Sequence, residues 1–196
     1  MFKDKLRVGI AGLGTVGGGV VKLFESTARL GERLSLTAVS ARSRGRARGV
    51  DIAGYRWFDD PVAMAADPDI DVVVEVIGGG EGVAKNVVET ALARGAHVVT
   101  ANKALLAVHG AALARLAERN GTKLLFEAAV GGGVPMVKAL KESLSGCRAT
   151  AVAGILNGTC NYILTEMEAS GRSFEAVLAD AQRLGYAEAD PTMDVG

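Results

Sequence analysis

Short apolar runs alternate with longer segments whose apolar residues recur at helical spacing along the first two thirds of the chain. The runs predict strands over Leu6–Ala11, Leu34–Ala41, Asp71–Ile77, His97–Thr100 and Lys123–Ala128. The periodic segments predict helices over about Gly17–Ala28, Lys85–Arg94 and Ala104–Asn120. Strands that alternate with helices are typical of a parallel sheet covered on both faces. We therefore expect an α/β fold with a doubly wound parallel sheet over residues 1–134.

The pattern changes after Val134. Pro135 at a first helical turn predicts a helix over the segment PMVKALKESL, because proline suits the start of a helix. An apolar strand is expected over Ala149–Leu156, followed by helices over about Asn161–Ala169 and Phe174–Leu184. Residues 135–196 are therefore expected to begin a second domain.

Composition narrows the class of partner. The 196 residues carry 22 basic and 22 acidic side chains, so the net charge is zero and no general attraction to nucleic acid or to an anionic membrane is expected. A small molecule is the expected partner. Cys147 and Cys160 cannot form a disulfide framework, and no signal peptide precedes the first apolar run. No apolar run approaches the roughly 20 residues that span a bilayer, so we expect a soluble protein of the reducing cytoplasm.

The first chemical motif follows the first predicted strand and reads Gly12-Leu-Gly-Thr-Val-Gly17. Glycines at this spacing permit a tight turn, while the start of the next helix offers unpaired N–H groups to a pyrophosphate. This context favours a dinucleotide site of the Rossmann type, although a glycine-rich turn that binds nothing is the alternative. The residues expected to bind the cofactor here are Gly12, Gly14, Thr15, Val16 and Gly17.

The end of the second predicted strand bears on which dinucleotide binds. Sites for NAD usually place Asp or Glu there, whereas sites for NADP place an arginine that meets the 2′-phosphate. This chain has Ser40-Ala-Arg-Ser-Arg-Gly-Arg46, with no acid before Asp51. NADP is favoured through Arg42 and NAD is possible, while an ordinary solvated basic loop is the alternative.

Two further strand ends are expected at the same edge of the sheet. Gly78 and Gly79 follow the third long strand and would permit close approach of the cofactor, whereas Glu75 inside that strand is taken as structural. The fourth strand ends at Thr100 and is followed by Asn102 and Lys103, beside the expected nicotinamide. Lys103 would donate a proton or a hydrogen bond to a carbonyl oxygen that receives hydride. Its alternative role is to solvate the start of a helix.

Four blocks resemble homoserine dehydrogenases: VVTANKALLA, LFEAAVGGGVPMVKAL, GILNGTCNYILTEM and LGYAEADPTMDV, in that order after the glycine motif. The resemblance covers essentially the whole chain. It implies an NAD(P)-dependent oxidoreductase that interconverts aspartate 4-semialdehyde and L-homoserine, a step toward threonine, methionine and isoleucine. It also implies that residues 135–196 begin an α+β domain for substrate binding and dimerisation, in a homodimer when the protein is full length.

The resemblance assigns roles to particular residues. Lys103 matches the family's active-site lysine, and Glu188 and Asp194 match acids that act in catalysis and hold the substrate. Further residues expected to contact the substrate are Asn157, Gly158, Thr159 and Tyr186. Gly131 is expected to lie beside the nicotinamide. A loop expected to bind Na⁺ or K⁺, mainly through backbone carbonyls, contributes Glu127, Val130, Gly132 and Val134. The alternatives without a function are that Glu188 and Asp194 are solvated loop acids and that the glycine-rich loop is a flexible hinge between domains.

The chain also departs from the family pattern. Homoserine dehydrogenases continue after the DPTMDV block with a segment of the type Gly-x-Asp-Ala-Ala-x-Lys, whereas this sequence stops at Gly196. We therefore expect a piece of a longer protein, which need not turn over substrate alone. Two other interpretations stay open at this point: an aspartate or saccharopine-type dehydrogenase, and a non-catalytic nucleotide-binding module.

Overall fold

The chain divides into two compact units at Val130 and Gly131, a few residues before the boundary expected near Val134. The computed structural model describes residues 5–154 and 158–187. Each unit is described by itself below. No helix within these described ranges combines the length and the apolarity needed to cross a membrane.

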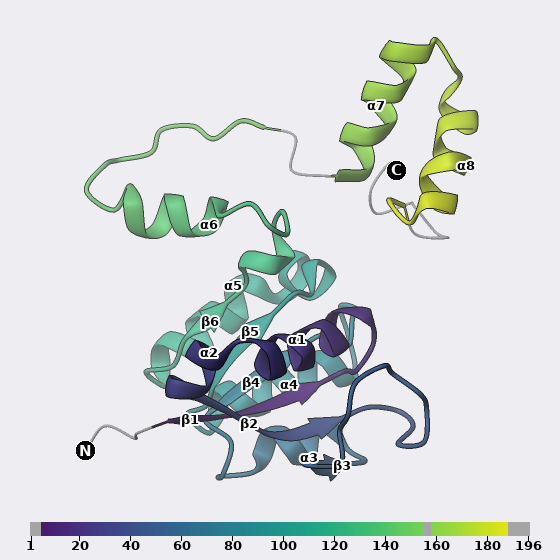
Figure 1. Ribbon diagram of the computed structural model, residues 1–196. Helices are drawn as coiled ribbons and strands as arrows, with labels where there is room; N and C mark the ends of the chain where they lie inside the picture. Colours follow the sequence, from purple (N-terminus) through teal and green to yellow (C-terminus); the bar gives the residue numbers. More distant parts are fainter. Residues whose placement is uncertain (1–4, 155–157, 188–196) are drawn as a thin grey trace. The chain divides into compact units, whose positions relative to one another are not determined.

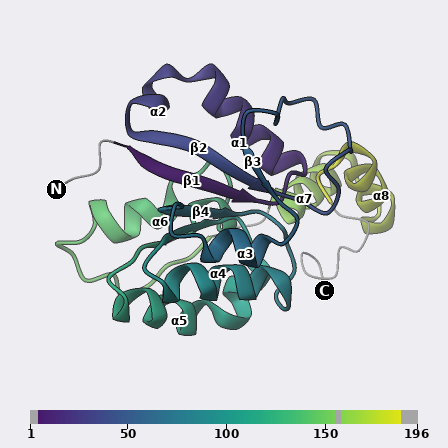
Figure 2. The same cartoon turned by 90° about the horizontal axis from the view of Figure 1, so that it is seen from below.

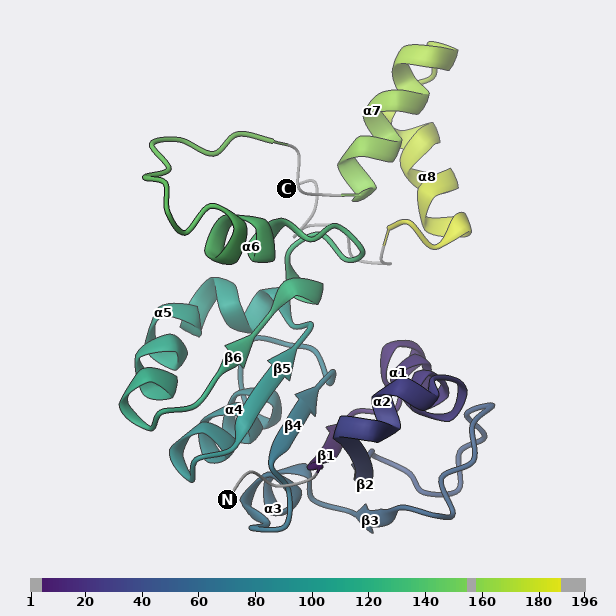
Figure 3. The same ribbon diagram turned by 60° about the vertical axis from the view of Figure 1, so that its left-hand side comes forward.

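The first unit is built on one six-stranded sheet, in which every pair of neighbouring strands is parallel (Figures 1 and 3). The strand order is β3-β2-β1-β4-β5-β6. The strands are β1 (Leu6–Ala11), β2 (Leu34–Ser40), β3 (Arg56–Phe58), β4 (Val72–Glu75), β5 (His97–Thr100) and β6 (Leu124–Leu125). The expected doubly wound, Rossmann-type sheet is therefore confirmed. All six strands run the same way, so their carboxyl ends share one edge.

Helices cover both faces of this sheet, as Figure 2 shows. They are α1 (Thr15–Ser26), α2 (Ala28–Arg33), α3 (Pro61–Ala66), α4 (Val83–Ala93) and α5 (Lys103–Arg119). On one face, α3, α4 and α5 bury apolar side chains such as Met64, Val87 and Leu113 against the strands. On the other face, Val21 of α1 packs with Ile10 and Val39. The apolar stripes read from the sequence thus form two cores, one on each side of the strands.

Several short elements of the first unit, including α2, β3, α3 and the 3₁₀ helix η1 (Glu127–Ala129), were not expected. The strand β3 has three residues and pairs only with β2, so it is too short to show a period-two pattern. The helix α3 begins with Asp60 as its N-cap, whose side chain accepts a hydrogen bond from the Val62 N–H, and Pro61 follows at its first position. The last strand, expected over Lys123–Ala128, is much shorter, because it lies at the sheet edge and gives way to η1.

The described part of the second unit is helical. It contains α6 (Met136–Lys138), the π-helical turn η2 (Ala139–Ser143), α7 (Gly158–Ser170) and α8 (Phe174–Leu184). Ile163 of α7 packs with Val177 and Ala181 of α8 in a small core of its own. The helix expected over Phe174–Leu184 is confirmed.

The strand expected over Ala149–Leu156 is wrong for its described part, residues 149–154, which form neither strand nor helix. An apolar run becomes a strand only where a neighbouring strand completes its ladder of hydrogen bonds. The described residues of the second unit supply no such neighbour.

Candidate functional site

The turn between β1 and α1 has no room for side chains at two of its glycines. Gly12 has a φ of 105°, and a Cβ there would lie 2.5 Å from the Val76 carbonyl oxygen. A Cβ at Gly17 would lie 1.9 Å from the Gly12 carbonyl oxygen. A Cβ at Gly14 would have no other atom within 4 Å, so this face of the turn is open. The motif therefore packs tightly against the protein on one side and leaves the start of α1 accessible on the other.

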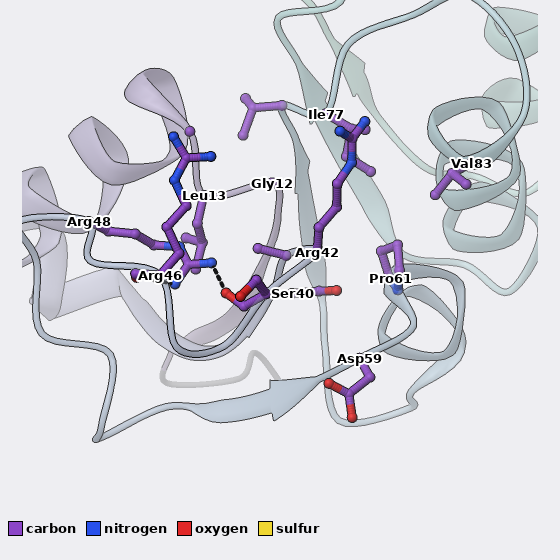
Figure 4. A pocket seen from close by; sticks show the side chains of 14 residues that line it. Gly12, Leu13, Ser40, Arg42, Arg46, Arg48, Asp59, Pro61, Ile77 and Val83 are labelled. Carbon is purple, nitrogen blue, oxygen red and sulfur yellow. Dashed lines mark hydrogen bonds between the residues drawn. The ribbon is translucent and has the colours of Figure 1, made fainter.

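A pocket of about 450 Å³ adjoins this turn (Figure 4). This volume falls within the range of small-molecule sites. The pocket is lined by Gly12, Leu13, Gly14, Ser40, Ala41, Arg42, Ser43, Arg46, Arg48, Asp59, Pro61, Val76, Ile77 and Val83. It brings together three residues expected from the sequence to bind cofactor, Gly12, Gly14 and Arg42, while Thr15 and Val16 are exposed in the first turn of the adjoining helix.

One wall of the pocket is basic. Arg42 and Arg46 project from the loop after β2, and both side chains are exposed. Neither guanidinium makes a hydrogen bond or ion pair with another residue in the described part of the chain. Ser40, the last residue of β2, also lines the pocket, and its hydroxyl is buried with no partner among the described residues. This wall offers hydrogen-bond donors to an anion.

The other wall is mainly apolar. Pro61, Ile77 and Val83 line it from three separate elements, beside the carboxylate of Asp59 (Figure 4). That carboxylate accepts a hydrogen bond from the Trp57 indole N–H at 2.6 Å. Apolar walls with a few placed polar groups suit a flat ring system.

A buried hydrogen-bond network ties the ends of β4 and β5 together. Glu75 and Thr100 are directly opposite each other in the sheet, and both are fully buried. The Thr100 hydroxyl donates to Glu75 Oε2 at 2.6 Å and accepts from the Asn102 N–H at 3.0 Å. The other carboxylate oxygen, Oε1, accepts from the N–H groups of Ile77 at 2.8 Å and Gly78 at 3.3 Å. Glu75 therefore joins the loop after β4 to the turn after β5.

Asn102 extends this network to the start of α5. Its side-chain amide donates to the Gly79 carbonyl oxygen at 2.7 Å, and its side-chain oxygen caps the helix by accepting from the Leu105 N–H at 3.0 Å. Lys103 is the first residue of α5 and is exposed. The structure thus brings Gly78, Gly79, Thr100 and Asn102 together, with Lys103 at the rim. The side chains of Thr100 and Asn102 are engaged in holding this edge.

In the second unit, two of the expected substrate residues lie together. The Thr159 hydroxyl, near the start of α7, donates to the Tyr186 carbonyl oxygen at 2.6 Å. The Tyr186 ring stacks on Tyr162 with centroids 4.7 Å apart. Gly158 is the first residue of α7. Asn157, Glu188 and Asp194 lie outside the described residues.

The cation loop expected from the resemblance stays a prediction. Glu127 lies in η1 and Val130 follows it in the first unit, while Gly131, Gly132 and Val134 open the second unit. Within residues 5–154 and 158–187, no group of three or more His, Cys, Asp or Glu side chains is placed to hold a metal ion. The ligands expected in the cation loop are mainly backbone carbonyls rather than such side chains.

Comparison with known proteins decides the family. The family model described as "Homoserine dehydrogenase, NAD binding domain" matches residues 12–127, and the one described as "Homoserine dehydrogenase" matches residues 135–196. The chain belongs to the homoserine dehydrogenase family. Homoserine dehydrogenases of Neisseria gonorrhoeae and Pseudomonas aeruginosa are 45% and 48% identical to it over 97% of its length.

Solved homoserine dehydrogenases share the fold. The enzyme from Thiobacillus denitrificans aligns with a TM-score of 0.87 and 44% identity, covering 97% of this chain and 45% of that one. A hyperthermophilic archaeal homoserine dehydrogenase in complex with NADPH aligns with a TM-score of 0.79 and 26% identity, over 97% of this chain and 65% of that one. The chain spans 44% of the length of the two curated relatives, somewhat less than half.

Membership of the homoserine dehydrogenase family favours that interpretation over the aspartate and saccharopine-type dehydrogenases. The matched NAD-binding domain is the unit that contains the glycine turn and the pocket.

Several residues of the pocket were not expected from the sequence. Ser40 stands at the end of the second predicted strand, where a residue that contacts the ribose of the cofactor is expected, so the sequence could have indicated it. Asp59 and Pro61 follow the unexpected β3 and had no such signal. Arg48 shares its loop and residue type with Arg42, and only the folded loop separates their roles.

Proposed function

We propose that this chain forms the NADP-binding domain and part of the substrate domain of a homoserine dehydrogenase. The whole enzyme would transfer hydride between NADPH and aspartate 4-semialdehyde to give L-homoserine. One observation carries the cofactor assignment: the glycine turn at the start of α1 and the guanidinium groups of Arg42 and Arg46 face the same pocket.

One end of this pocket suits the pyrophosphate of NADP, and the other end suits its 2′-phosphate. The open start of α1 offers N–H groups and the positive end of the helix dipole to the pyrophosphate. Arg42 and Arg46 offer paired donors to a 2′-phosphate, for which arginine geometry is well suited. The apolar wall of Pro61, Ile77 and Val83 would take the adenine ring. A pocket for NAD would more often present an acid at the end of β2, where this chain has Ser40.

Lys103 is the proposed catalytic group. Bound NADPH would supply a hydride to the carbonyl carbon of the semialdehyde. The Lys103 ammonium would stabilise the electron pair that the carbonyl oxygen gains and would give that oxygen a proton, directly or through one water. The network of Glu75, Thr100 and Asn102 fixes the first turn of α5 and so holds the backbone of Lys103 at the edge where the strands end.

The remaining assignments follow from the family. Glu188 and Asp194 would act in catalysis and hold the hydroxyl and amino ends of homoserine, with Asn157, Gly158, Thr159 and Tyr186 beside them. The backbone carbonyls of Glu127, Val130, Gly132 and Val134 would bind Na⁺ or K⁺, with Gly131 near the nicotinamide. The full-length protein would be a cytoplasmic homodimer, and Cys147 and Cys160, which form no disulfide in the described part of the chain, are compatible with a reducing compartment.

The cofactor proposal is tested on this chain by titrating NADPH and NADH and following nucleotide fluorescence. We expect NADPH to bind more tightly than NADH. Replacing Arg42→Gln should weaken NADPH by about tenfold or more and leave NADH within about twofold, because only NADPH carries the phosphate that the guanidinium meets. Equal affinities for the two nucleotides in the unaltered chain would contradict the NADP assignment.

The catalytic proposal is tested in the full-length protein by following homoserine oxidation. Lys103→Ala should lower kcat by about 10²- to 10⁴-fold, the usual range for a proton-transferring group, and leave the Kd for NADPH within about twofold. Lys85→Ala is the control, because Lys85 forms a surface pair with Glu89 at 2.9 Å in α4. Retention of kcat in Lys103→Ala would exclude a catalytic role for this lysine.

A further inference from the structure

One arginine of the basic loop points into the loop itself. Arg48 Nη1 donates to the backbone carbonyl oxygens of Arg46 at 2.7 Å and Arg44 at 3.2 Å, and Nη2 donates to that of Ser43. The guanidinium carbon also lies 5.6 Å from the centre of the Trp57 ring. The side chain is half-buried, and its Nε has no partner among the described residues. Three carbonyls of the loop therefore converge on a single guanidinium.

The neighbouring arginines behave differently. Arg42, Arg46 and Arg48 all line the pocket, but only the Arg48 side chain makes hydrogen bonds within the described residues. Arg44 is exposed and is not part of the pocket wall. The loop thus holds one arginine as an internal support and presents two to the ligand.

The support is anchored to the sheet and to the first helix. Trp57 lies in β3, which pairs with β2, and its indole N–H is held by Asp59. At the other side, a Cβ added to Gly18 of α1 would lie 3.9 Å from the Arg48 carbonyl oxygen, so the backbone of Arg48 runs close to that helix. The loop between these anchors forms neither helix nor strand over residues 41–48. Within this stretch of the described chain, the hydrogen bonds that join one part of the loop to another come from Arg48.

We propose that Arg48 is a positioning residue for recognition of the 2′-phosphate. By drawing the carbonyls of Ser43, Arg44 and Arg46 around its guanidinium, it holds the loop in the form that presents Arg42 and Arg46 to the phosphate. It sets the preference for the phosphorylated nucleotide without contacting the phosphate. This inference rests on the proposed NADP site.

The physical reason is preorganisation. A flexible loop must be ordered when the ligand binds, and the cost is subtracted from the affinity. An arginine carries five donors in a rigid fork, so one side chain can satisfy three carbonyls while its flat face lies on an aromatic ring. Lysine carries the same charge but cannot reproduce this arrangement. Replacement of Arg48 by lysine therefore separates the geometry of the loop from its charge.

The test uses two probes that differ by one phosphate, 2′,5′-ADP and 5′-AMP, titrated into this chain by calorimetry. Arg48→Lys and Arg48→Gln should each weaken 2′,5′-ADP by about tenfold, with 5′-AMP changed by less than about twofold. Arg44→Gln is the matched control, because it removes one charge from the same loop outside the pocket wall. It should change neither affinity by more than about twofold.

A second measurement needs no ligand. Trypsin cleaves after arginine, and a loosened loop exposes the bonds after Arg44 and Arg46. Cleavage there should be faster in Arg48→Lys and Arg48→Gln than in the unaltered chain, since proteolysis follows the population of open loop. Cleavage at an unchanged rate would refute the proposed support.

The outcomes separate the two proposals. Equal binding of both probes by the unaltered chain would refute the NADP site, and the inference with it. Normal discrimination in Arg48→Lys with loss in Arg48→Gln would show that charge or direct contact matters, and would refute the inference alone. Equal losses in Arg44→Gln and Arg48→Gln would also refute it, in favour of a general charge effect.

Discussion

Thr100→Val tests the buried network directly, because valine keeps the shape of threonine and removes only its hydroxyl. In the unaltered chain this hydroxyl donates to Glu75 Oε2 and accepts from the Asn102 N–H. The substitution leaves a fully buried carboxylate oxygen without its donor and a backbone N–H without its acceptor. Thr100 and Glu75 are both fully buried, so water does not replace the lost partners easily.

The expected cost follows from these two groups. Leaving a buried polar group unsatisfied costs about 1–3 kcal/mol, and more for a charged one, so Thr100→Val should lower the free energy of unfolding by about 2–4 kcal/mol. A matched control is Thr122→Val. The Thr122 hydroxyl donates once, to the Ala117 carbonyl oxygen at 3.2 Å, and that oxygen keeps the Thr122 N–H at 2.9 Å. The control should therefore cost about 1 kcal/mol.

Urea unfolding followed by tryptophan fluorescence is the assay. Trp57 is the single tryptophan of the sequence and lies in β3, so its signal reports on the first unit. The midpoint should fall in Thr100→Val with an unchanged slope, as expected when only stability changes. A cost for Thr100→Val no larger than that for Thr122→Val would refute the reasoning that Glu75 depends on this hydroxyl.

Two other predictions concern the glycine turn and the acid end of the pH range. Gly17→Ala should abolish detectable nucleotide binding and cost about 1–3 kcal/mol of stability or more, because its Cβ would overlap a backbone carbonyl, whereas Gly19→Ala meets nothing within 4 Å and should stabilise the helix by about 0.5–1 kcal/mol. Calorimetric binding and urea unfolding measure both; normal binding by Gly17→Ala would contradict the packing described. The hydrogen bond from Arg172, and then that from Arg183, lowers the pKa of Asp180 below its ordinary 3.8. The interactions of Asp180 with Arg172 and Arg183 therefore stabilise the fold at pH values above 3.8. This stabilisation is lost as the pH falls through the lowered pKa of Asp180. Carboxyl NMR titration should show Asp180 returning toward 3.8 in Arg172→Gln, and an unchanged titration would exclude this cause.

Much of the fold follows from local patterns. The strand β1 and the helix α8 carry clear apolar periods, and their bounds agree with the expectation. The strand β3 has three residues and owes its existence to β2, so no local pattern could reveal it. The apolar run over residues 149–154 shows the reverse case, in which a local pattern finds no partner among the described residues.

Some features of the candidate site also follow from local sequence, whereas others depend on the folded chain. The glycine turn is predictable because its spacing directly reflects backbone geometry. The partnership of Glu75 with Thr100 depends on the register between β4 and β5, which is a property of the assembled sheet. Nor does the sequence distinguish Arg48 from Arg42 or Arg46. Residue type and spacing are alike, and only the folded loop decides which guanidinium turns inward.

The place of the basic loop in the sheet has a consequence for engineering. The loop leaves β2 and returns through β3, the strand at one edge, whereas Lys103 and the buried network stand at the ends of β4 and β5. On the two proposals made above, cofactor preference and hydride chemistry would be encoded in separate stretches of the gene. A graft of residues 41–58 from a relative with the opposite preference would carry its own Arg48–Trp57 support or the equivalent, and would leave the reacting end untouched.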